Sequence, residues 1–365
     1  HCRKMLNIPC KLNHRVAIGK AWRTHGIANA PLCNDTIIQE VQLLSPGKHI
    51  ELKLGRKISL RTIHRPLRDI FCKSRRTYVE HLQKTVQKMI ASIYNIALQK
   101  DILLEFGLSG GLDSRVILGL CLQSEEIMNS MYIQTSTQPT RSKDFDIVES
   151  LSQQFGFEFN NLAKKKQFIT ESAITTKVVE NPIGLWALSN LGLYDSVFLT
   201  KEISEIPKII RMGGQGAETI KDMWSGYTID SLISKGVRDD VRNSIRSQMH
   251  QALTSSGVDP LADDAIKWHH LAYKSAFHNG RFVTQSPLSL RPFLNRGIFS
   301  IYNSPDNPFV GTGRESPTIC HDLLIVLDKE LASHPFESNY KNISNEYAEN
   351  RLDQLGINPS NLFSI

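Results

Sequence analysis

Apolar positions in the first half of this chain follow two different periods. Residues 77–100 carry apolar side chains three and four positions apart, which predicts an amphipathic helix. The next run, residues 102–108, is short and almost wholly apolar, as is typical of a buried strand. From Ser114 onward the apolar positions predict a second helix. The pattern therefore indicates a helix, a strand and another helix in direct succession.

The same alternation continues downstream. Residues 128–135 and 157–162 are predicted strands, and residues 143–155 between them have helical spacing. Strands that alternate with helices at these lengths favour an α/β fold, with a parallel sheet that has helices on both faces. Ligands of such sheets bind beyond the carboxyl ends of the strands. The C-terminal third is predicted to be mainly helical.

The N-terminal part has a different pattern. Residues 1–60 consist of short apolar patches broken by turn residues, with residues 37–44 and 49–54 as the best strand candidates. Residues 61–76 are polar and basic and are predicted to be a linker. We therefore expect a small β-rich N-terminal segment, a linker, and an α/β domain over residues 77–365.

Composition narrows the class of protein. The 365 residues include 41% hydrophobic residues, and no apolar run approaches the roughly 18 residues of a membrane helix. The net charge of +7 would attract nucleic acid, or ATP and acidic substrates. Six dispersed cysteines without a C-x-x-C pair predict reduced thiols in the cytoplasm. The residue at position 1 is His1 instead of Met, which indicates that upstream sequence is missing.

The turn between the strand 102–108 and the following helix carries candidate chemistry. It contains Ser109, Gly110, Gly111, Asp113 and Ser114. Glycines let the backbone approach an anion closely, and the free N–H groups of a helix N-terminus attract it. The two hydroxyls can donate hydrogen bonds, and the carboxylate can hold a Mg²⁺ that bridges phosphate oxygens. These residues predict a phosphate site.

Other interpretations of this turn explain less. An ordinary strand-to-helix turn needs only one capping residue, such as Ser or Asp. The turn is no P-loop, because no Lys-Ser/Thr follows its glycines, and its adjacent glycines differ from the spaced ones of a Rossmann fingerprint.

A second glycine-rich turn follows about 100 residues later. After residues 209–212, of which all but Arg211 are apolar, come Gly213, Gly214, Gln215 and Gly216, and then the carboxylate of Glu218. Because Mg²⁺ prefers oxygen ligands, Asp113 and Glu218 are predicted to share a Mg²⁺ on the phosphates.

The two turns together resemble a known family. The stretch Leu108-Ser-Gly-Gly-Leu112-Asp-Ser-Arg is most similar to the synthetase domain of the glutamine-dependent asparagine synthetases, within the N-type ATP pyrophosphatase (PP-loop) superfamily. The family's second motif is Ser-Gly-Glu-Gly-Ser-Asp-Glu, whose glycines and metal-binding carboxylate match Gly214, Gly216 and Glu218. Gln215 replaces a Glu. This resemblance implies an adenine nucleotide alpha hydrolase-like fold.

The resemblance also implies roles for individual residues. It makes Asp113, Glu218 and Lys341 the catalytic candidates, with Asp113 and Glu218 as metal ligands. Arg291 resembles the Arg of the family's Arg-x-Pro-Phe-Leu-Asp segment, and either a phosphate contact or a structural ion pair would explain it. The nucleotide-binding candidates are Leu108, Ser109, Gly110, Gly111, Leu112, Asp113, Ser114, Ile133, Gly214, Gln215 and Gly216.

Residues 36–48 resemble the last segment of the family's N-terminal glutaminase domain. Residues 1–60 are therefore predicted to be the incomplete tail of such a domain. The family's glutaminase uses an N-terminal Cys as nucleophile, whereas position 1 is His1, and Cys2 is not assigned that role. We expect no glutaminase activity from this chain as it stands. Whether a glutaminase domain lies upstream or acts as a separate subunit stays open.

By this resemblance the protein is an amide-forming ligase. A carboxylate, aspartate or a related acid, would attack the α-phosphorus of ATP and release pyrophosphate, and ammonia or an amine would then displace AMP. The expected cofactors are ATP and Mg²⁺, and the partners are the small carboxylate and the amine donor.

Two alternatives remain. The first is a tRNA-modifying PP-loop enzyme, which would suit the basic charge. No appended basic RNA domain is visible, however, so nucleic acid is not an expected partner. The second is an ATP-binding family member that has lost catalysis, which the altered residues around Gln215 suggest.

Overall fold

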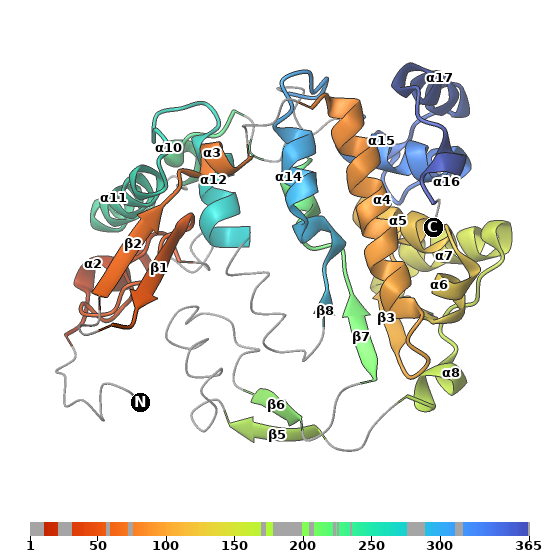
Figure 1. The fold of residues 1–365 in the computed structure, drawn as a ribbon, viewed down its shortest axis with the longest axis horizontal. Coiled ribbons are helices and arrows are strands. Elements are labelled where there is room, and N and C mark those ends of the chain that lie inside the picture. Colours follow the sequence, from red (N-terminus) through yellow and green to blue (C-terminus); the bar gives the residue numbers. More distant parts are fainter. Residues whose placement is uncertain are drawn as a thin grey trace. The chain divides into compact units, whose positions relative to one another are not determined.

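The computed structural model describes residues 11–20, 31–55, 59–71, 76–168, 173–177, 199–203, 208–221, 224, 226–233, 236–275, 289–310 and 317–363. The chain folds into two compact units, whose elements are labelled in Figure 1. The first unit contains His1–Lys73, Thr175–Glu202 and Trp224–Gln285, and the second contains Ser74–Ile174, Ile203–Met223 and Ser286–Ile365.

These units differ from the predicted domains. Two stretches of the predicted C-terminal domain, Thr175–Glu202 and Trp224–Gln285, belong to the first unit with the N-terminal residues. The predicted linker, residues 61–76, contains the end of strand β2 and a short helix, α3. A local pattern carries no information about which distant segments pack together.

The second unit is built on a parallel sheet. The strands are β3 (Leu103–Gly107), β4 (Met131–Gln134), β7 (Ile209–Met212) and β8 (Ser289–Leu290). They lie in the order β4-β3-β7-β8, and every neighbouring pair is parallel. The predicted α/β class with a parallel sheet is confirmed at this level. Figure 1 shows β3, β7 and β8 side by side.

Helices of the second unit flank the sheet. Most match the predicted pattern, and the long helix α4 closely follows the amphipathic segment 77–100. The helices are α4 (Tyr78–Ala97), α5 (Leu112–Cys121), α6 (Glu125–Asn129), α7 (Ser142–Phe155), α8 (Leu162–Lys166), α14 (Arg296–Tyr302), α15 (Ile319–Leu327), α16 (Lys329–Ser333) and α17 (Asn345–Leu355). Short 3₁₀ turns are η1 (Pro139–Arg141), η4 (Ala217–Thr219), η6 (Pro292–Leu294), η7 (Asn339–Lys341) and η8 (Pro359–Asn361).

The predicted strand at residues 157–162 is reduced to one bridge, between Phe159 and Ile133. Asn160 has a φ of +56°, which turns the backbone out of the extended conformation. Asn161 then caps helix α8 by accepting a hydrogen bond from the Lys164 N–H at 3.2 Å. Two polar residues that favour turns and caps therefore override the apolar pattern.

The two faces of β3 have different environments because successive side chains alternate across a strand. Leu104 and Phe106 belong to the large apolar core of this unit. Glu105, which interrupts the apolar run, points to the other face and is only 4% exposed. There its carboxylate pairs with Lys165 of α8 and, at 3.0 Å, with Arg211 of β7. The buried charge is thus compensated from two elements.

The first unit contains helices and an antiparallel hairpin. The hairpin pairs β1 (Lys48–Lys53) with β2 (Ser59–His64), and the helices are α2 (His14–Lys20), α3 (Leu67–Phe71), α10 (Ile229–Leu232), α11 (Asp239–Ser255) and α12 (Ala265–His269), followed by one π-helical stretch, η5 (His270–Ser275). The predicted strand 49–54 corresponds to β1. The predicted strand 37–44 forms only isolated bridges, Leu12 with Ile38 and Asp35 with Gln42.

Strands β5 (Ala173–Lys177) and β6 (Leu199–Ile203) pair in a separate two-stranded sheet. Residues 1–10, which include His1 and Cys2, lie outside the described residues. In the part of the chain that is described, no helix is long and apolar enough to cross a membrane.

Candidate active site

The two glycine-rich turns meet at one edge of the sheet. Strands β3 and β7 pair in parallel, with Phe106 opposite Met212, so both turns leave the carboxyl end of the sheet. A Cβ added to Gly214 would lie 2.8 Å from the Cβ of Asp113. The second turn therefore passes directly over the candidate carboxylate of the first, and only glycine leaves room for it.

The first turn is held by its own hydroxyls. The hydroxyl oxygens of Ser109 and Ser114 lie 3.0 Å apart, and the backbone N–H of Ser109 donates to Ser114 Oγ at 3.2 Å. Gly111 is the N-cap of α5, and no side chain caps that helix. The turn thus presents backbone donors and serine hydroxyls at a helix N-terminus, an arrangement suited to an anion.

Asp144, from α7, also reaches this turn. Its Oδ1 accepts a hydrogen bond from the Gly110 N–H at 2.9 Å, and its Oδ2 lies 3.5 Å from Arg141 Nη1. A phosphate bound at the turn would use the same Gly110 N–H. It would therefore have to displace the Asp144 carboxylate or share this donor with it. The sequence pattern predicted the helix over 143–155 but gave no sign of this contact.

Asp113 is paired with a lysine that the sequence analysis did not single out. The ammonium of Lys221 forms an ion pair with Asp113 Oδ1, and the two side chains are 25% and 34% exposed. Burial alone would lower the pKa of Lys221, but the carboxylates of Asp113 and Glu218 raise it above its usual value. Lys221 follows Glu218 by three residues, and this spacing was the only sign in the sequence that Lys221 could belong to the site.

The second turn is shaped by its glycines. Gly216 has a φ of +102°, and a Cβ there would lie 2.8 Å from Leu294 Cδ2 and 3.0 Å from the backbone carbon of Phe293. The Gly216 N–H donates to Glu218 Oε2 at 2.8 Å. The side-chain oxygen of Gln215 folds back towards Gly213. Glu218 is thus turned towards its own backbone, while its charge still acts on Lys221.

A cavity of about 350 Å³ opens beside the first turn, between the carboxyl ends of β3 and β4. Leu108 and Ser109 line it, as do Gln134, Thr135 and Ser136. The Thr135 hydroxyl is buried, and within the described ranges it has no hydrogen-bond partner. Leu108 and Ser109, two of the predicted nucleotide-binding residues, therefore lie at this cavity.

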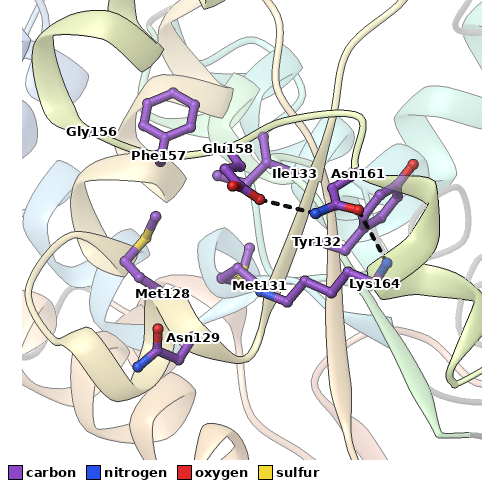
Figure 2. A pocket seen from close by; sticks show the side chains of 10 residues that line it. All are labelled: Met128, Asn129, Met131, Tyr132, Ile133, Gly156, Phe157, Glu158, Asn161 and Lys164. Atoms are coloured by element: carbon purple, nitrogen blue, oxygen red, sulfur yellow. Dashed lines mark hydrogen bonds between the residues drawn. The ribbon is translucent and has the colours of Figure 1, made fainter.

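Ile133 does not line that cavity. It is 2% exposed and contributes instead to a second cavity of about 210 Å³ beside the edge strand β4. Figure 2 shows this cavity, with Met128 and Phe157 on one side and the hydrogen bond from Asn161 to Glu158, 2.9 Å long, on the other. The residues after Ile133 are better placed for a nucleotide than Ile133 itself.

Arg115 fastens the C-terminal part of the unit to the first turn. Its guanidinium is fully buried, lies 3.6 Å from the ring centre of Phe336 and donates to the carbonyl of Pro335 at 2.7 Å and to that of His334. Burial lowers the pKa of Arg115 to about 9, against the raising effect of Glu337. Arg115, the residue after Ser114 in the motif, thus has a structural role: it holds residues 334–336 against the start of α5.

This tie brings Lys341 to the site. The backbone N–H of Glu337 donates a hydrogen bond to the Gly110 carbonyl at 3.4 Å. The side-chain Oε1 of Glu337 lies 3.9 Å from the position that a Cβ on Gly111 would occupy. Lys341 forms an ion pair with that same Oε1. Two lysines, Lys221 and Lys341, therefore stand near the turn, each held by an acidic side chain.

Arg291 lies against the second turn. Its Nη1 donates hydrogen bonds to the carbonyls of Arg211 and Leu290, at 3.2 and 3.3 Å. A Cβ added to Gly213 would lie 2.9 Å from the same Nη1. Burial and the nearby Arg211 lower the pKa of Arg291. Its contacts with backbone carbonyls fix the position of the turn.

The carboxylates present suit one Mg²⁺ that is shared with phosphates. Among the residues described, no group of three or more His, Cys, Asp or Glu side chains is arranged around a metal position. Mg²⁺ commonly takes one or two protein carboxylates and completes its shell with phosphate oxygens and water. Asp113 and Glu218 provide that number, although Asp113 is already paired with Lys221.

The chain matches no protein-family model, and no curated protein matches it. The resemblance to asparagine synthetases therefore rests on the motif residues themselves. The fold and site define an α/β protein with two adjoining glycine-rich turns at the carboxyl edge of a parallel sheet.

Proposed function

We propose that this protein is an ATP-dependent, amide-forming ligase of the asparagine synthetase type. It would adenylate a small carboxylate, release pyrophosphate, and pass the acyl group to ammonia or an amine with release of AMP. A cytoplasmic location is part of the proposal, because ATP is available there and isolated cysteines stay reduced.

The observation that carries this proposal is the contact of Gly214 with Asp113. It joins two turns, about 100 residues apart in the sequence, at one edge of the sheet. A single glycine turn after a strand is common, whereas two that close on one carboxylate at a helix N-terminus make a site for a charged phosphate chain.

The side chains divide the work. The N–H groups at the start of α5, with Ser109 and Ser114, would bind the β- and γ-phosphates and stabilise the departing pyrophosphate. Lys341 would add positive charge from the opposite segment. The cavity beside Leu108 and Thr135 would take the adenosine and hold the α-phosphorus at the turn. Mg²⁺, held by Asp113 and Glu218, would neutralise charge on the leaving pyrophosphate.

Pyrophosphate release tests this function. The full chain is incubated with ATP, Mg²⁺ and ammonia across a panel of carboxylates led by aspartate, and Asp113→Ala is run in parallel. We expect release that depends on one carboxylate and falls at least 100-fold in the variant, because the carboxylate that orders the metal and the turn is lost. An amide product identified by mass spectrometry would complete the assignment.

Other results would support the alternatives. Release only with a tRNA would favour an RNA-modifying enzyme, and its affinity would then fall steeply with salt. ATP binding without release for any acid would favour a catalytically silent protein. Activity with glutamine only when a glutaminase is added would show that a separate glutaminase supplies the ammonia from glutamine.

A further inference from the structure

The ion pair between Lys221 and Asp113 suggests how the site handles charge. The sequence predicts that Asp113 binds Mg²⁺, yet its Oδ1 is held by a side-chain ammonium. We propose, building on the proposed function, that Lys221 is a phosphate-binding residue of this site. Its ammonium remains at Asp113 and contacts the β- and γ-phosphates, so that Asp113 and Glu218 hold only the one Mg²⁺ that arrives with ATP and no second ion is required.

Lys221 is firmly placed for this role. The preceding residue, Ile220, is 1% exposed and belongs to the apolar core, and its N–H donates to the Ala217 carbonyl at 3.1 Å. Gly214, at the other end of the turn, is in contact with Asp113. The segment that leads to Lys221 is thus anchored at Gly214 and at Ile220.

The charges around Lys221 favour a bound ammonium. Its ammonium forms an ion pair with Asp113 Oδ1, and the carboxylate of Glu218, three residues earlier in the chain, also acts on it. Lys221 therefore faces two carboxylates from two turns, at the place where the sequence predicts a shared metal.

An ammonium can serve Asp113 and phosphate together. It is a compact charge with three donors on a flexible stem, so one N–H can stay on the carboxylate while others reach phosphate oxygens. Without Lys221, the triphosphate would approach the carboxylates of Asp113 and Glu218 with no ammonium between them. The repulsion would have to be removed by an additional cation from solution.

Nucleotide affinity at varied Mg²⁺ tests this inference without any turnover. A non-cleavable α,β-methylene ATP is titrated calorimetrically into the full chain at several concentrations of free Mg²⁺, all high enough to keep the nucleotide as its Mg²⁺ complex. The variants are Lys221→Met, Lys221→Arg and the pair Asp113→Asn with Lys221→Met. Lys208→Met is the matched control, because Lys208 is exposed and precedes β7 at the opposite end of that strand.

We expect a Kd for wild type that depends little on further Mg²⁺. In Lys221→Met the Kd should rise about tenfold at low Mg²⁺ and recover as Mg²⁺ increases, because the ion takes the place of the ammonium on Asp113. Lys221→Arg and Lys208→Met should resemble wild type. The double variant should lose the added Mg²⁺ dependence, since the Asp113 carboxylate that the added ion would neutralise is gone; it also covers the case in which Lys221→Met does not fold.

Counting bound Mn²⁺ by electron paramagnetic resonance gives a second readout. One ion per bound nucleotide is expected for wild type and two for Lys221→Met. Equal Kd values and equal ion counts in these two proteins would overturn the role of Lys221 while leaving ATP binding established. Absence of nucleotide binding by wild type at every Mg²⁺ concentration would overturn the proposed function and this inference with it.

Discussion

At the scale of single residues, the candidate site is a set of opposite charges already matched to each other. Asp113 is held by Lys221, Glu337 by Lys341 and Asp144 by the Gly110 N–H. Each acid lies where a phosphate or a metal ion is expected. Binding of a nucleotide therefore requires exchange of partners, and the energy of these contacts sets how tightly the nucleotide is held.

The contact of Gly214 with Asp113 leads to a prediction for Gly214→Ala. The added Cβ would lie 2.8 Å from the Asp113 Cβ and 3.5 Å from its backbone carbon, so the turns have to separate. We expect the Kd for ATP to rise about tenfold or more, equivalent to about 1.4 kcal/mol, in calorimetric titrations.

Gly119→Ala is the control for that change. A Cβ there would lie 3.2 Å from Leu327 Cδ1 and Leu331 Cδ2 and 3.4 Å from Leu327 Cβ, and none of these residues belongs to the two turns. Its ATP affinity should equal that of wild type. Equal affinities for Gly214→Ala and Gly119→Ala would contradict the close contact of the two turns.

At the scale of elements, capping residues decide where helices begin, and they also explain where the predicted pattern failed. Helix α4 starts at a capping box in which Thr77 Oγ1 accepts from the Glu80 N–H at 3.3 Å, and the Thr77 N–H donates to Glu80 Oε2 at 2.8 Å. Asn161 likewise starts α8 and ends the predicted strand 157–162. Polar residues at such ends outweigh a short apolar run.

The capping box of α4 predicts a loss of stability for Thr77→Ala. The variant leaves an N–H of the first turn without its side-chain acceptor, which should cost about 1 kcal/mol of unfolding free energy. Urea unfolding followed by circular dichroism measures it.

Ser92→Ala, inside the same helix, is the matched control. Ser92 is exposed and donates to the Lys88 carbonyl within the helix at 2.7 Å. Its replacement should change stability by less than about 0.5 kcal/mol, because alanine favours the helix. A similar loss in both variants would argue against the capping box as the cause.

At the scale of the whole molecule, the chain forms two compact units from interleaved segments. Trp224 and Trp268 belong to the first unit. Tryptophan fluorescence therefore reports the unfolding of that unit. This makes it possible to assign a change in stability to one unit of the intact chain.

Acid should destabilise the first unit through His269. Burial lowers the pKa of His269 to about 4, against a hydrogen bond in which its Nε2 donates to the Leu32 carbonyl at 2.8 Å. The unfolded state, with a pKa near 6.5, binds more protons between these two values, so stability falls as pH falls through that window. The loss should reach about 3 kcal/mol when complete.

Urea unfolding followed by tryptophan fluorescence at pH 7 and pH 4.5 measures this loss. His269→Gln keeps a side-chain donor for Leu32 and removes the titration, so it should show a much smaller difference between the two pH values. The same pH dependence in wild type and His269→Gln would assign the effect to other groups.

The sequence by itself determined the parts of the molecule that are encoded within a short stretch. Within 44 residues, from Tyr78 to Cys121, the chain forms helix α4, strand β3, the glycine turn and helix α5. Each of these is marked in the sequence by its spacing of apolar residues or by its capping or glycine residues. Parallel pairing of the strands followed from their alternation with helices. The two turns were predicted to share a Mg²⁺ through Asp113 and Glu218, which requires them to be neighbours.

Only the tertiary structure decided which side chains face those turns. Lys221, Asp144 and Glu337 come from three separate segments, and their partners are chosen by how helices and strands pack. The same holds for the first unit, where Trp224–Gln285 joins the N-terminal residues. Local periodicity reports which face of an element is buried, whereas the identity of the neighbour depends on contacts between distant segments that no short pattern records.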